Sequence, residues 1–121
     1  MNYTANSATS YQEIVCRDFP ITPYVGGDME RVIKAMNWNI VSIQIAWEGL
    51  TGTLDGVLTV QQRNADFLPW QDTTLTANVD SAAGTHIFEN IEFGGESLNL
   101  KFALTGITGG TVSIVCIGKR K

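Results

Sequence analysis

The sequence has little of what marks an enzyme or a metal protein. It contains one histidine, His86, and two cysteines, Cys16 and Cys116, with no cysteine pair at metal-binding spacing. The neighbours of His86 form no catalytic motif, so neither a Ser-His-Asp nor a Cys-His site is indicated. The glycine pairs match no phosphate-binding loop and are interpreted as turns. We therefore expect no catalysis, no metal ion and no cofactor.

Long apolar runs and an excess of basic residues are also missing. No segment approaches the roughly 18 apolar residues that span a bilayer. The first ten residues have neither a basic start nor an apolar run, which argues against a secretory signal. The net charge of -4 argues against nucleic-acid binding, which usually needs a basic face. We expect a soluble protein, made in the cytoplasm, that binds neither membrane nor nucleic acid.

The two cysteines lie near opposite ends of the chain, in segments that are predicted as the first and last strands. If those strands are neighbours, a disulfide would close a long loop. The preferred interpretation is that Cys16 and Cys116 are free, buried thiols acting as small hydrophobic residues, as is usual in the cytoplasm.

The composition is that of one globular domain. Of the 121 residues, 44% are hydrophobic and 17% are charged, which excludes a disordered chain and allows a sizeable core. The first ten residues are polar, so residues 1–10 are expected to form a flexible arm and residues 11–121 the folded domain.

Hydrophobic residues alternate with polar ones along much of the chain. Such a period of two is typical of a strand with one buried face. The final predicted strand, 111–117, is apolar on both faces, which indicates a strand that is central in its sheet or lies beneath another subunit. The alternation predicts a core of Val41, Ile43, Ile45, Trp47, Leu58, Val60, Leu98, Leu100, Phe102, Leu104, Val112 and Ile114.

About eight strands at roughly ten-residue spacing, with glycine turns between them, predict the fold class. It is all-β: a single-domain antiparallel β-sandwich, jelly-roll-like. Asp55-Gly56 is interpreted as a hairpin signal, and residues 106–110 as a turn. Residues 28–36 have a short helical pattern, but a strand over 30–35 is preferred.

Aromatic residues in predicted loops are the main binding signal. Trp38 lies in a predicted turn, and Trp70 ends a loop that also contains Phe67 and Leu68. A loop aromatic can stack on a sugar ring, but more often it packs within the protein or against a neighbouring subunit. Trp38, Phe67, Leu68 and Trp70 are therefore the candidate interface or ligand-contact residues.

Residues 42–53, residues 55–62 and the loop closed by Trp70 carry a resemblance to a known family. A strand ending in Trp, a Gly-Thr turn, a Val-Gln strand and a Trp-closed loop resemble small β-sandwich structural proteins of tailed bacteriophages, which are accessory or decoration proteins of the virion. The chain departs from this pattern at residues 63–66, where a glycine is expected.

The resemblance implies a non-enzymatic virion structural protein: a capsid decoration, a head fibre or another accessory component. Its expected partners are itself, as a homo-oligomer, and other virion proteins. Its expected location is the virion, and the host cytoplasm during assembly. The family carries no catalytic residues to transfer to this sequence.

A carbohydrate-binding β-sandwich module is the alternative, with a glycan as the partner. Exposure of Trp38 and Trp70 side by side on one face would favour it, because paired aromatic rings make a platform for sugars.

Overall fold

The computed structural model describes residues 10–21, 29–33, 40–92, 97–104 and 106–119. Within these ranges there is no helix, and so none that could cross a membrane. The same ranges contain eight strands: β1 (Ser10–Pro20), β2 (Met29–Ile33), β3 (Ile40–Gly52), β4 (Gly56–Arg63), β5 (Gln71–Val79), β6 (Gly84–Glu92), β7 (Ser97–Ala103) and β8 (Ile107–Lys119).

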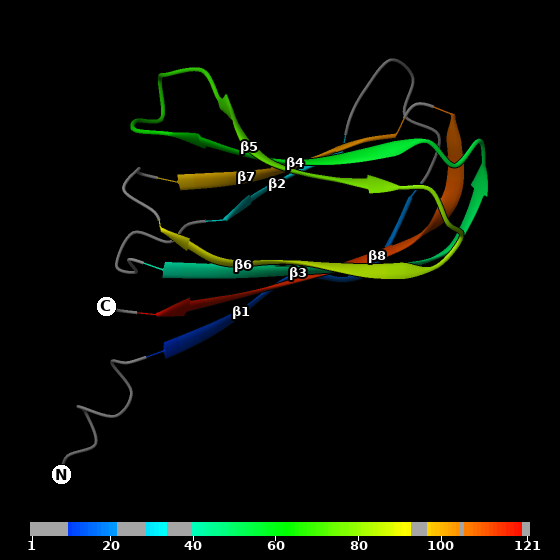
Figure 1. Ribbon diagram of the computed structural model, residues 1–121, viewed down its shortest axis with the longest axis horizontal. Helices are drawn as coiled ribbons and strands as arrows, with labels where there is room; N and C mark the ends of the chain where they lie inside the picture. The colour runs from blue at the N-terminus through cyan, green and yellow to red at the C-terminus, as the bar shows by residue number, and fades with distance from the viewer. Residues whose placement is uncertain (1–9, 22–28, 34–39, 93–96, 105, 120–121) are drawn as a thin grey trace, which may run out of the picture.

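The strands form two four-stranded sheets that face each other (Figure 1). The first sheet has the order β1-β8-β3-β6 and the second has the order β2-β7-β4-β5, and every pairing in them is antiparallel. The chain passes repeatedly from one sheet to the other, which is the connectivity of an eight-stranded jelly roll. The predicted jelly-roll-like sandwich is confirmed.

The core lies between the two sheets and is built from alternate residues of the strands. On β3, burial alternates from Val41 to Trp47, because successive side chains point to opposite faces of a strand. Trp47 also satisfies its indole N–H, which donates to the carbonyl oxygen of Ser81 at 3.2 Å. All twelve core residues predicted from the alternation are buried: Val41, Ile43, Ile45, Trp47, Leu58, Val60, Leu98, Leu100, Phe102, Leu104, Val112 and Ile114.

The hairpin predicted at Asp55-Gly56 is wrong. The strands on either side of it, β3 and β4, belong to different sheets, so the chain crosses between layers there. Gly56 is required for space, because an added Cβ would lie 2.8 Å from the ring of Phe102 and 3.2 Å from the carbonyl oxygen of Ala103. The Asp55-Gly56 dipeptide thus indicates that a glycine is needed at this place, but it does not indicate why.

The turn predicted over residues 106–110 is shorter than expected. The N–H of Ile107 donates to the carbonyl oxygen of Leu104 at 2.9 Å, and β8 begins at Ile107. This turn also joins two sheets, since β7 belongs to the second sheet and β8 to the first. As predicted, β8 is central: it lies between β1 and β3.

The segment of residues 28–36, whose sequence pattern fitted either a helix or a strand, is a strand where the structure describes it. Met29–Ile33 pairs with β7 over its whole length, which confirms the preferred interpretation for these residues. The remainder of the predicted strand, at 34–35, lies outside the described residues, as do residues 1–9 of the predicted arm.

The two cysteines lie on neighbouring strands and are not bridged. Cys16 is opposite Ile114, and Cys116 is opposite Glu13, so the two thiols do not face each other. Both are free, as predicted. Burial, with a smaller contribution from the charge of Glu13, raises the pKa of Cys116 to about 12, which keeps this thiol protonated and unreactive at neutral pH.

Candidate functional site

The loop of residues 64–70 connects β4 to β5 and carries three of the four predicted contact residues. Within it, the N–H of Leu68 donates to the carbonyl oxygen of Ala65 at 3.1 Å, which closes a tight turn. Among the described non-glycine residues, only Asp18 has a positive φ. The loop therefore needs no glycine at residues 63–66, where the resemblance led us to expect one.

A row of polar side chains ties the strands that flank this loop to β7. Asn99 on β7 donates from Nδ2 to Oε1 of Gln61 on β4 at 2.8 Å. Gln61 in turn donates from Nε2 to Oδ1 of Asp72 on β5 at 2.7 Å. The strand register places the three residues opposite one another, and we call them the polar row.

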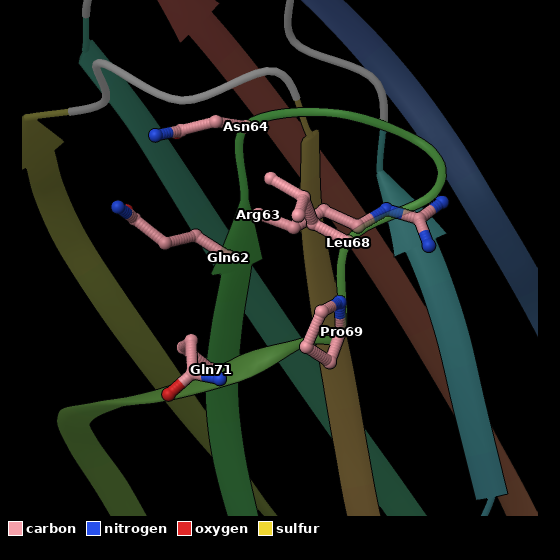
Figure 2. Close-up of a pocket in the computed structure, with 6 residues that line it drawn as sticks. All are labelled: Gln62, Arg63, Asn64, Leu68, Pro69 and Gln71. Atoms are coloured by element: carbon pink, nitrogen blue, oxygen red, sulfur yellow. The ribbon is translucent and has the colours of Figure 1, made fainter.

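Two members of the polar row are buried although they lie on the outward face of the second sheet, whereas the third, Asp72, is exposed. Asn99 is 0% exposed and Gln61 is 7% exposed, while the neighbouring Leu98 and Leu100 point into the core. In Figure 2 the 64–70 loop passes across the β7 ribbon, on its way from the end of β4 to the start of β5. The two buried amides, Asn99 and Gln61, are joined by a hydrogen bond, as buried polar groups generally are.

The predicted contact residues of the loop differ in their exposure. Phe67 is 87% exposed and Leu68 is 41% exposed, as expected for contact residues. Trp70 is half-buried, and the guanidinium carbon of Arg63 lies 4.1 Å from the centre of its ring. One face of the Trp70 ring is thus covered by a cation–π contact within the protein. Trp38 lies outside the described residues.

A pocket of about 310 Å³ lies beside the loop. Its lining combines amide side chains with apolar ones: Gln62, Arg63, Asn64, Leu68, Pro69 and Gln71. Figure 2 shows the amides of Gln62 and Asn64 on the same side of β4, whereas the guanidinium of Arg63 points the opposite way. This pocket could not be predicted from the sequence, because its amide residues resemble an ordinary solvent-exposed strand end.

The outward face of the first sheet carries a second apolar surface. The register places Ile14, Val115, Gln44 and Ile87 in one row across β1, β8, β3 and β6. Of these, Ile14 is 59% exposed and Ile87 is 45% exposed, and the nearby Ile117 is 37% exposed. We call Ile14, Ile87, Val115 and Ile117 the apolar band. Its sequence signal was the final strand, which is apolar on both faces.

Two further features bear on the chemistry of the molecule. In the ranges that the structure describes, no group of three or more His, Cys, Asp or Glu residues is placed to hold a metal ion. His86 packs its ring edge-on against Phe88, with 4.5 Å between ring centres, and so contributes to the packing of β6.

No protein-family model matches the chain, and no curated protein matches its sequence. Its fold does match solved structures. A chain from the structure of the infectious bursal disease virus Gx strain aligns with 92% of this chain at 11% identity, with a TM-score of 0.56. A chain from the VP2 subviral particle of the same virus aligns over 92% at 14% identity, with a TM-score of 0.52.

The extent of these matches differs between the proteins compared. This chain spans about a third of the viral chains, 32% in each case. It covers 90% of a chain from Bacillus endospore appendages, described as disulfide-linked pili, at 12% identity and a TM-score of 0.49. At such identities the likeness is one of fold, and the fold that this chain shares with the viral particles is a β-sandwich.

Proposed function

We propose that this protein is a non-enzymatic structural component of a bacteriophage virion, such as a capsid decoration, a head fibre or another accessory part. It acts by contact with copies of itself and with other virion proteins. The proposal combines the resemblance to phage structural proteins with the surface chemistry of the domain. The proposed location of the protein is the virion.

The observation that carries the proposal is the exposure of Phe67. An aromatic side chain that is 87% exposed, next to a Leu68 that is 41% exposed, is unfavourable on a lone domain in water. The loop that bears them is closed by its own turn, and the two strands that it connects are linked by the hydrogen bond between Gln61 and Asp72. Rigid aromatic side chains of this kind are typical anchors of protein–protein interfaces.

The apolar band supports self-association, and the charges at its two ends indicate how a second copy fits. On the same outward face, Lys119 lies opposite Ile40 at one end of the β3–β8 pair, and Glu48 lies opposite Thr111 at the other end. Both charged residues are exposed. A two-fold axis in the plane of this face, perpendicular to the strands, places Lys119 of each copy over Glu48 of the other.

Truncation of the loop aromatic tests the structural role. The change is Phe67→Ala, and its matched control is Val32→Ala, which removes an exposed apolar side chain, 43% exposed, from β2. We expect Phe67→Ala to weaken attachment to purified particles by about tenfold or more, the effect of losing an anchor residue, and Val32→Ala to leave it unchanged. Particles reconstituted with each variant and analysed by mass spectrometry provide the measurement.

Two results would contradict the proposal. One is a protein that stays monomeric in analytical ultracentrifugation and is absent from purified particles. The other is equal attachment of the Phe67→Ala and wild-type proteins.

A further inference from the structure

We propose that the pocket beside the 64–70 loop is a binding site for a neutral sugar. This site is separate from the assembly contacts proposed above, and it differs from a platform of tryptophans. The proposal rests on four features of the pocket: its amide groups, its apolar wall, the absence of carboxylates from the described part of its lining and its size.

Three amide side chains with unused hydrogen-bonding capacity gather at the pocket. They are Gln62 at the end of β4, Asn64 in the loop and Gln71 at the start of β5. Among the described residues, no hydrogen bond engages their side-chain amides. Each amide offers two N–H donors and one carbonyl acceptor, and this is the mixture that neighbouring hydroxyl groups of a sugar require, since each hydroxyl both donates and accepts.

Leu68 and Pro69 provide an apolar wall next to these amides. A sugar ring has C–H groups on its faces and hydroxyl groups around its edge. An apolar surface beside convergent polar groups therefore matches both parts of the ring, and such a combination is general for small-molecule sites. The volume of about 310 Å³ lies near the lower end of the range for ligand pockets, roughly 300–1,000 Å³, which fits one sugar unit.

The charges of the lining favour a neutral ligand. Among the described residues that line the pocket there is no carboxylate, and Arg63 is the one cation. The guanidinium of Arg63 lies over the Trp70 ring and points away from the amides of Gln62 and Asn64 (Figure 2). A ligand carboxylate bound at the amides would therefore lack a cationic partner there, and burying an unpaired charge is costly.

The polar row makes the site preorganised. Gln61 adjoins Gln62 in β4, and Asp72 adjoins Gln71 in β5, so the hydrogen bond between Gln61 and Asp72 fixes the spacing of the two strands on which the pocket amides lie. A site whose groups are already in place loses less entropy when a ligand binds.

Titration with single sugars tests the site. The probes are glucose, galactose, mannose and N-acetylglucosamine, each added to the full chain at millimolar concentration, with glucuronate as the charged comparison. Two-dimensional NMR of the ¹⁵N-labelled protein should show shifts confined to residues 62–71 with at least one neutral sugar. Gln71→Ala should lower that affinity by about tenfold, the equivalent of one lost hydrogen bond of about 1.4 kcal/mol.

Gln12→Ala is the matched control, because Gln12 is an exposed glutamine on β1 in the other sheet. It should bind the same sugar with unchanged affinity, and the spectra of both variants report whether the fold is intact. The proposal is overturned if none of the four neutral sugars shifts residues 62–71, if Gln12→Ala reduces binding as much as Gln71→Ala, or if glucuronate binds more tightly than the neutral sugars.

Discussion

At the scale of the residue, a phenylalanine side chain has a different role in the core and in the 64–70 loop. Phe102 is 2% exposed and packs between the sheets, whereas Phe67 is 87% exposed at the tip of a turn. The hydrophobic effect stabilises the fold only where burial removes apolar area from water. Phe102 therefore contributes to the stability of the fold, whereas Phe67 is available for contact with another molecule.

This separation gives the first stability prediction. Phe102→Ala should lower the free energy of unfolding by about 3–5 kcal/mol, because it removes a buried ring and leaves a cavity. Phe67→Ala should change it by no more than about 0.5 kcal/mol, as is usual for exposed positions. Urea denaturation of the two variants provides the comparison, and a loss below about 1 kcal/mol for Phe102→Ala would mean that the β7 register is wrong.

At the scale of the element, the second sheet depends on hydrogen bonds as well as on apolar packing. β7 is buried on both faces over Ser97–Leu100, with leucines inward and Ser97 and Asn99 outward. Both outward positions are buried, and Asn99 is hydrogen-bonded there: its Nδ2 donates to Gln61, whose own Nε2 donates to Asp72. The hydrogen bond between Gln61 and Asp72 links the two strands that flank the 64–70 loop and the pocket beside it.

Replacement of Gln61, the central residue of the polar row, should therefore lower the stability of the protein. Gln61→Leu leaves Nδ2 of Asn99 buried without its acceptor, and we expect a loss of about 1–3 kcal/mol in the free energy of unfolding. Gln12→Leu, the same change at an exposed position of β1, should have almost no effect. Thermal unfolding monitored by circular dichroism measures both, and equal melting temperatures for the two variants would be incompatible with a structural role of the row.

At the scale of the whole molecule, the two outward faces are chemically different. The first sheet presents the apolar band with Lys119 at one end and Glu48 at the other. The second sheet carries the polar row and, between β4 and β5, the 64–70 loop. A domain with one apolar outer face and one exposed aromatic loop is suited to an assembly in which each copy makes more than one contact.

A charge exchange tests the arrangement of two copies on the first sheet. Glu48→Lys and Lys119→Glu should each weaken self-association, because each places like charges against one another across the two-fold axis. The double variant should restore it, since the opposite charges meet again. Sedimentation equilibrium at low salt measures the dimer constant; equally weak association of the double variant would exclude this packing.

The sequence by itself determined the fold class and the membership of the core. The period-two alternation of residues such as Val41 to Trp47 and Leu98 to Leu104 is a local consequence of strand geometry, so it could be read without knowing which strands pair. Phe67 and Leu68 were placed in a loop outside the alternating pattern, and both are exposed.

Only the tertiary structure decided which strands share a sheet and what lies over each face. Asp55-Gly56 appeared to be a hairpin, but the need for glycine came from Phe102, a residue distant in sequence. Asn99 and Gln61 alternate with core residues along their strands and face outward, yet both are buried and joined by a hydrogen bond. The pairing of strands, the burial of their outward faces and the formation of pockets depend on contacts between residues far apart in the chain. A local sequence pattern contains no information about those contacts.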